Sequence, residues 1–233
     1  MIEAEWWEYD DMAEMATAVA GDIGFIIESA LEARDACLLS LPGGSTPGPV
    51  LAQLAKTKVP WKRVTIIPTD DRLVPVGSDL SNVRELAKVF LPLSARVLPI
   101  ATENEDYRMA GNAADARLQD LSWPPDLVWL GMGEDGHTAS IFPGPDLQAA
   151  LEAPKARRAV GVMPEPLPTN APVARVTLTR AAILSARTLT ITITGQKKRE
   201  ILEAAIADGH SSKLPIGRVL AEAEQPIDIH WCP

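Results

Sequence analysis

The sequence has few cysteines, a short supply of basic residues and no long apolar run, and each shortage excludes a class of protein. Two cysteines, Cys37 and Cys232, in 233 residues make neither a disulfide framework nor a metal cluster, so we expect two ordinary thiols. No run of about 18 apolar residues is present, which argues against a membrane-spanning helix. The first residues lack a basic segment followed by an apolar one, so no secretory signal is expected. Together these shortages favour a cytoplasmic protein.

The charge balance excludes a second class of partner. Lys and Arg total 22 against 31 Asp and Glu, a formal net charge of −9, which repels polyanions such as nucleic acid. A small anion in a local basic pocket stays possible. Apolar residues make up 46% of the chain, enough for one domain over residues 1–233. We expect a small-molecule partner, and a monomer or a weak homo-oligomer.

Strand and helix patterns alternate along most of the chain. Strands are expected in the first ten residues and at 36–41, 64–68, 97–100, 126–130, 173–179, 188–194 and 227–231. Helices are expected at 10–31, 50–54, 81–90, 105–121, 180–185, 196–207 and 215–223. Such alternation predicts an α/β fold, an open doubly wound and mostly parallel sheet with helices on both faces. The proline-rich segment 154–172 predicts a small irregular or antiparallel β region after residue 154.

Two loops that follow expected strands have polar or glycine-rich sequences. Residues 42–48 contain Gly43, Gly44, Ser45 and Thr46 before Pro47, a composition that suits an anion at a helix N-terminus but is also common in an ordinary capped turn. Residues 69–75 contain Asp70 and Arg72 beside Asp71, which indicate either a site or a solvated turn.

A third loop, residues 131–144, follows the apolar strand at 126–130 and contains Gly131, Gly133, Gly136 and His137. Ligands of open α/β sheets lie outside the carboxyl ends of the strands, and an imidazole can take a proton from water near neutral pH. The glycines are expected to supply positive φ angles or close backbone approach. The alternative is a glycine-rich turn that happens to carry a histidine. His210 and His230 are interpreted as structural or surface residues.

Taken together, these loops resemble the 6-phosphogluconolactonase family, which is related to the glucosamine-6-phosphate isomerase and deaminase group. The landmarks are residues 43–47, 70–72, 74–75, 81–82, 131–144, 175–179 and 194–199. One departure is Asp71, where the family usually has Glu. The resemblance implies hydrolysis of 6-phospho-D-glucono-1,5-lactone to 6-phosphogluconate in the oxidative pentose phosphate pathway, without a metal or another cofactor.

The resemblance also implies roles for single residues. His137 would be the general base, Asp70 would orient its partners, and Arg72 would supply positive charge. Gly43, Gly44, Ser45 and Thr46 would hold the phosphate, with Lys198 and Arg175 matching its charge. Lys198, rather than Lys197, stands three residues after the glycine, as the lysine of the family does.

Two other functions stay open. An aminosugar-6-phosphate isomerase or deaminase would share the fold, but that group carries a Glu shortly after its histidine in an Asn-Glu-Pro-Gly context, whereas residues 141–144 read Ile-Phe-Pro-Gly. A non-catalytic sugar-phosphate sensor would keep the phosphate loop and would need a DNA-binding segment, which the sequence does not reveal.

Overall fold

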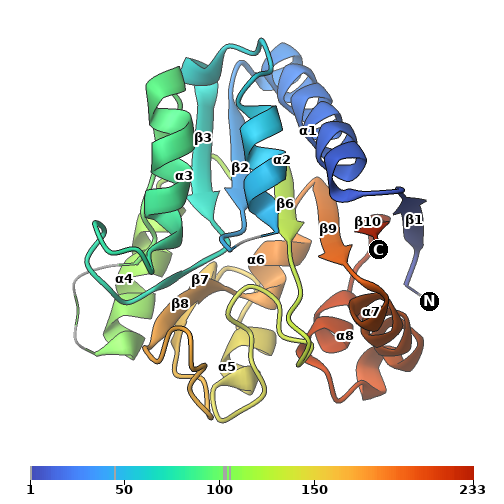
Figure 1. Cartoon of the computed structure of the whole chain (residues 1–233). Helices are drawn as coiled ribbons and strands as arrows, with labels where there is room; N and C mark the ends of the chain where they lie inside the picture. Colours follow the sequence, from blue (N-terminus) through green and yellow to red (C-terminus); the bar gives the residue numbers. More distant parts are fainter. Residues whose placement is uncertain (1, 45, 102–103, 105) are drawn as a thin grey trace.

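The computed structural model describes residues 2–44, 46–101, 104 and 106–233 and is built around a seven-stranded parallel sheet (Figure 1). The strand order is β1-β10-β9-β6-β2-β3-β5. The strands are β1 (Ala4–Glu8), β2 (Cys37–Leu41), β3 (Val64–Pro68), β5 (Arg96–Val97), β6 (Leu127–Leu130), β9 (Thr188–Thr194) and β10 (Ile227–Cys232). The predicted fold class is confirmed.

Helices cover both faces of this sheet and enclose two apolar cores. One core lies under α1 (Met12–Arg34), α2 (Pro47–Leu54) and α3 (Asn82–Phe90). The other lies under α4 (Tyr107–Gln119), α5 (Leu147–Leu151), α6 (Arg180–Leu184), α7 (Gln196–Asp208) and α8 (Pro215–Leu220). Adjacent strand residues alternate between the cores: Leu39 belongs to the first and Leu38 to the second. This alternation is the period of two that a strand buried on both faces requires.

A second sheet of three antiparallel strands lies beside the first and corrects one expectation. Its order is β4 (Asp70–Arg72), β8 (Arg175–Leu178) and β7 (Ala159–Val162). The small β region was expected only after residue 154, yet one of its strands is the Asp-Asp-Arg segment that had been expected to be a loop. The carboxylate of Asp71 turns inward and is buried, so the polar composition concealed a strand.

Helix α4 packs against β7 at a contact between two glycines. A Cβ added to Gly161 would lie 1.7 Å from the carbonyl oxygen of Tyr107, and one added to Gly111 would lie 2.0 Å from the amide nitrogen of Gly161. Backbone therefore meets backbone where the small sheet joins the rest of the molecule.

Several expected elements differ in detail from the structure. The strand expected at 97–100 is the short β5, and α5 was not expected. In β9, Thr192 is buried, at 2% exposed, and accepts a hydrogen bond from Trp129 Nε1 at 2.9 Å. Both cysteines are buried and unbonded. Within the described residues, no helix has the length and apolar character needed to cross a membrane.

The strand order determines which loops can meet. Strands β9, β6, β2 and β3 are neighbours in the sheet, and the chain passes from β2 to β3 on one side and returns to β6 on the other. A reversal of this kind opens a crevice at the carboxyl ends of the strands. Four segments follow these four strands. They are the glycine loop (residues 42–48), the Asp-Asp-Arg segment (residues 70–72), the histidine loop (residues 131–144) and the start of α7.

Candidate functional site

A cleft of about 320 Å³ lies at the carboxyl ends of the central strands. The residues that line it are Pro42, Gly43, Gly44, Thr46, Pro47, Thr69, Asp70, Arg72, Asn82, Gly131, Met132, Gly133, His137, Ala139, Asn170, Arg175, Thr192 and Lys198. Eight of the nine site residues expected from the sequence are among them. The ninth, Ser45, lies outside the described residues.

The glycine loop approaches the cleft with its backbone. A Cβ added to Gly43 would lie 1.9 Å from Oδ1 of Asn82, so the close approach of the loop to α3 requires glycine there. Pro47 occupies the first turn of α2, as expected, but Thr46 makes no side-chain capping hydrogen bond. A backbone that ends at a helix N-terminus with a hydroxyl outside the capping role can hold an anion.

Asp70 is buried, and its carboxylate is held by two hydroxyl groups. Ser140 Oγ donates to Oδ2 at 2.5 Å, and Thr69 Oγ1 donates to Oδ1 at 3.1 Å. Because Ser140 belongs to the histidine loop, Asp70 links that loop to β4.

Asp71 stabilises the start of α3. Its carboxylate accepts hydrogen bonds from the amides of Arg72, Asn82 and Val83 at 2.9, 2.7 and 3.2 Å, and from Ser81 Oγ at 3.2 Å. Burial raises the pKa of Asp71 above its ordinary value, although the backbone hydrogen bonds oppose that shift. Asn82 is thereby fixed, and it accepts from Arg72 Nη1 and donates Nδ2 to the carbonyl of Asp70 at 2.8 Å.

Two arginines lie side by side at the cleft. Arg72 and Arg175 are register partners across the antiparallel pair β4 and β8, where side chains are direct neighbours and like charges repel. Both Nε atoms are buried without a hydrogen-bond partner in the part of the chain that the structure describes. Burial lowers the pKa of Arg175, which nearby Asp70 raises and Arg72 lowers further. An anion between the guanidinium groups would relieve the repulsion and satisfy these donors.

His137 is held by a carboxylate that the sequence analysis did not single out. Its Nδ1 lies 2.5 Å from Asp135 Oδ1, and the same oxygen accepts from the His137 amide at 3.1 Å. When Nδ1 donates to Asp135, Nε2 is the nitrogen that can accept a proton. Burial raises the pKa of Asp135, but its hydrogen bond and charge interaction with His137 outweigh burial, so the pKa lies below the ordinary value.

The imidazole ring has close neighbours on other sides as well. It stacks on Phe142, with the ring centroids 4.1 Å apart. A Cβ on Gly133 would lie 2.3 Å from the His137 ring, so this glycine gives the close approach that the sequence predicted. Gly136 has the predicted positive φ of 75°. Gly131 differs, because its φ is not positive and a Cβ there would meet nothing within 4 Å.

Adjacent lysines at the start of α7 have different surroundings. Lys197 Nζ pairs with Glu134 at 2.5 Å on the surface, whereas Lys198 lines the cleft. This geometry favours Lys198 as the residue that meets an anionic ligand.

Sequence reasoning gave no role to Asp135, Ser140, Asn82 or Asn170, although the first three lie within the motifs that carry the family resemblance. Asp135 stands two residues before His137 in a glycine-rich loop, and that spacing was the available signal. Ser140 and Asn82 make hydrogen bonds between segments far apart in the sequence, and no local pattern marks such bonds. In the described residues, no group of three or more His, Cys, Asp or Glu side chains is arranged to hold a metal ion.

Comparison with known proteins adds an independent observation. A family model described as glucosamine-6-phosphate isomerases/6-phosphogluconolactonase matches residues 10–231. The chain is 35% identical to a 6-phosphogluconolactonase of Mesorhizobium japonicum over 98% of this chain and 95% of that protein. It is 34% identical to one of Rhizobium meliloti over 97% of both.

Solved structures agree with the sequence relatives. A crystal structure of a 6-phosphogluconolactonase from Shewanella baltica OS155 matches with a TM-score of 0.91 and 30% identity, covering 100% of both chains. A monomeric glucosamine-6-phosphate deaminase, 17% identical with a TM-score of 0.79 over 97% of both chains, shares the fold.

Proposed function

Because this chain belongs to the family of glucosamine-6-phosphate isomerases and 6-phosphogluconolactonases, we propose that it hydrolyses 6-phospho-D-glucono-1,5-lactone to 6-phosphogluconate, a step of the oxidative pentose phosphate pathway. The observation that carries the proposal is the His137–Asp135 pair at a cleft that also contains two adjacent arginines and Lys198. A base beside anion-binding groups is what hydrolysis of a phosphorylated ester requires.

His137 Nε2 takes a proton from a water molecule, and the carboxylate of Asp135 stabilises the imidazolium that forms. The resulting hydroxide adds to the lactone carbonyl, and Arg72 faces the negative charge that develops on the carbonyl oxygen. The tetrahedral intermediate then collapses, the bond to the ring oxygen breaks, and that oxygen receives the proton from His137. The phosphate rests on Gly43, Gly44 and Thr46, with Arg175 and Lys198 matching its charge.

Asp70 takes a positioning role in this scheme. Its carboxylate already accepts from Ser140 and Thr69, so it holds the histidine loop against β4 and leaves the proton transfer to His137.

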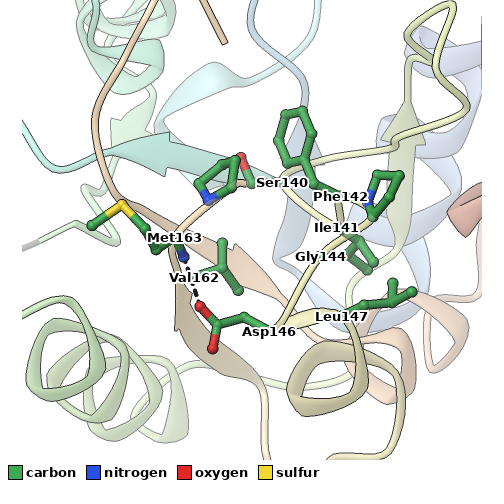
Figure 2. Close-up of a pocket in the computed structure, with 10 residues that line it drawn as sticks. Ser140, Ile141, Phe142, Gly144, Asp146, Leu147, Val162 and Met163 are labelled. Atoms are coloured by element: carbon green, nitrogen blue, oxygen red, sulfur yellow. Dashed lines mark hydrogen bonds between the residues drawn. The ribbon is translucent and has the colours of Figure 1, made fainter. Parts of the chain in front are cut away.

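The loop after His137 favours hydrolysis over the isomerase or deaminase alternative. Phe142 stands where those enzymes have the glutamate of their Asn-Glu-Pro-Gly segment, and it stacks on His137. The next carboxylate, Asp146, accepts from the amide of Met163 at 2.9 Å (Figure 2). The Asp146 carboxylate therefore holds the backbone at Met163 and does not replace the missing glutamate. The sensor alternative predicts a different assay result, since a sensor would bind the phosphorylated sugar without turnover.

The proposal also covers the domain organisation, the compartment and the assembly state of the protein. Residues 1–233 act as one lactonase domain, since the cleft draws on residues from Pro42 to Lys198. The two unbonded cysteines suit the reducing cytoplasm. The enzyme acts as a monomer or a weak homo-oligomer.

The test is the variant His137→Asn in a coupled assay with freshly generated 6-phosphogluconolactone. Asparagine keeps a polar side chain but removes the proton acceptor, so kcat should fall about 100-fold or more after correction for spontaneous hydrolysis. Binding of 6-phosphogluconate, measured by calorimetry, should persist because the phosphate contacts lie on other loops. Turnover near the parent rate would refute the general-base role, and absence of turnover in the parent protein would refute the function.

A further inference from the structure

A second cavity of about 440 Å³ adjoins the cleft. The two cavities share four lining residues, which are Arg72, His137, Asn170 and Arg175. The imidazole therefore faces two spaces, of which the function proposed above uses one.

The walls of the two spaces differ in chemistry. The cleft has the glycine loop, Lys198 and Asp70, whereas the second cavity has none of these. Its outer wall is mostly apolar and consists of Phe142, Pro143, Pro166, Leu167 and Pro168, with the exposed Glu165 beside them. Leu167 is 43% exposed, which leaves part of an apolar side chain available to a ligand.

This wall is held by hydrogen bonds at both ends. The Met163 amide donates to Asp146 at 2.9 Å, which anchors the chain just before Pro164 to the segment that follows the histidine loop (Figure 2). At the other end, Arg175 Nη2 donates to the carbonyl of Ala171 at 3.2 Å, and the Ala171 amide donates to the carbonyl of Pro168 at 3.2 Å. Prolines at 164, 166, 168 and 172 restrict the backbone between these anchors. The second cavity is thus a formed space at a fixed place beside His137.

From these observations we propose a second activity, the hydrolysis of uncharged apolar δ-lactones with the apolar part of the ligand in the second cavity. The proposal rests on the function above, because it uses the same base. An aryl-fused lactone such as dihydrocoumarin fits the chemistry, since its benzene ring suits a wall of proline, leucine and phenylalanine. A volume of about 440 Å³ lies within the usual range for small-molecule sites.

The chemical step is the same in either space. His137 removes a proton from water, the hydroxide adds to the lactone carbonyl, and Arg72 or Arg175 stabilises the oxyanion. The bond between the acyl carbon and the phenolic oxygen breaks, and the phenolic oxygen receives the proton from His137. The product is a hydroxyphenyl propionate, and no group beyond water is consumed. Lys198 and the glycine loop take no part, because the substrate carries no phosphate.

The experiment measures kcat/KM for dihydrocoumarin and for 6-phosphogluconolactone with one set of variants. Leu167→Asp places a charge in the apolar wall and should lower kcat/KM for dihydrocoumarin about tenfold or more, the scale on which apolar pockets discriminate. It should leave the phosphorylated lactone within about twofold, since Leu167 does not line the cleft. Leu167→Met, which keeps the wall apolar, should retain the dihydrocoumarin activity of the parent. Leu91→Asp is the matched control, an exposed leucine far along the chain that lines neither cavity.

The remaining variants complete the pattern. His137→Asn should abolish both activities, and Lys198→Ala should impair the phosphorylated lactone selectively. If dihydrocoumarin were hydrolysed but its rate followed Lys198 and ignored Leu167, it would be using the cleft, and the second site would be wrong. If the parent protein hydrolysed the phosphorylated lactone and left dihydrocoumarin at its spontaneous rate, the second activity alone would fail. Loss of both reactions in the parent would instead remove the function on which the proposal rests.

Discussion

Asp135 is the residue that most changes the chemistry expected of His137. An imidazole with one nitrogen hydrogen-bonded to a carboxylate has a defined tautomer, and its charged form is stabilised when it accepts a proton. At 2.5 Å the contact is close enough to serve both purposes. The orienting role that the family resemblance suggested for Asp70 therefore falls to Asp135 in our proposal.

Replacing Asp135 by Asn should lower kcat by about 100-fold, because the carboxylate that stabilises the imidazolium is lost while the shape is kept. Steady-state kinetics of the variant and the parent would measure the loss. Glu134→Gln is the control, because Glu134 pairs with Lys197 on the surface. An unchanged kcat for Asp135→Asn would show that the carboxylate serves only the loop.

Lys198 and Lys197 offer a matched pair for testing phosphate recognition. Lys198→Ala should raise KM for the phosphorylated lactone about 10- to 100-fold, the range expected for one charge-assisted hydrogen bond. It should change KM for unphosphorylated gluconolactone little. Lys197→Ala should leave both values near those of the parent. Equal losses on both substrates in Lys198→Ala would assign the lysine to the fold or to the chemistry.

Eight of the expected site residues line the cleft, and most of them could be placed there from the sequence because they follow strands whose carboxyl ends meet at one edge. The sequence could not reveal the arginine pair, since Arg72 and Arg175 are separated along the chain and become neighbours only through the register of β4 and β8. The same holds for the bond between Ser140 and Asp70.

Among the elements, the contact between α4 and β7 tolerates the least change. Gly161→Ala would place a Cβ 1.7 Å from the Tyr107 carbonyl, so α4 must move away from the small sheet. We expect a loss of unfolding free energy of about 3 kcal/mol, the upper part of the range for overpacking. Urea unfolding followed by circular dichroism would measure it. The control is Gly21→Ala in α1, where a Cβ meets nothing within 4 Å and helix propensity should add about 0.5 to 1 kcal/mol. Similar stabilities for the two variants would contradict the packing argument.

Long regular elements were predictable and short ones were not. Helix α1 and strand β9 carry strong local patterns, and α3 begins at the N-cap Ser81, whose Oγ accepts from the Arg84 amide at 3.3 Å. Strand β4 is three charged residues long and is held by the partner strand rather than by its own composition. Helix α5 is five residues long and depends on burial of Ala150 and Leu151 in the second core.

At the scale of the whole molecule, a buried histidine makes stability depend on pH. Burial lowers the pKa of His230 to about 4, with Asp228 acting weakly in the opposite direction. Burial likewise raises the pKa of Tyr9 to about 12, so its hydroxyl keeps its proton and can donate to His230 Nδ1, 2.9 Å away. The unfolded chain protonates this histidine near pH 6.5, whereas the folded protein does not until about pH 4.

The folded protein should therefore lose up to about 3 kcal/mol of stability as the pH falls from 6.5 to 4, with the full contribution present above pH 6.5. Asp22 partly offsets this loss, because burial raises its pKa and protonation then favours the folded state. Urea midpoints measured across this window should fall steeply in the parent and in His210→Gln, and less steeply in His230→Gln. A parallel decline in all three proteins would show that other groups dominate.

The register between β1 and β10 determines when β1 can pair during synthesis. Ala4 pairs with Ile227 and Glu8 with Trp231, so β1 waits for partners made more than 200 residues later. At about 5 to 20 residues per second this interval is at least about ten seconds. During it, α1 and the β2 to β6 region can collapse first, while Trp6 and Trp7 are without their neighbours from β10. The nascent chain therefore exposes Trp6 and Trp7 until β10 has been made, and pairing of β1 with β10 is a late folding step.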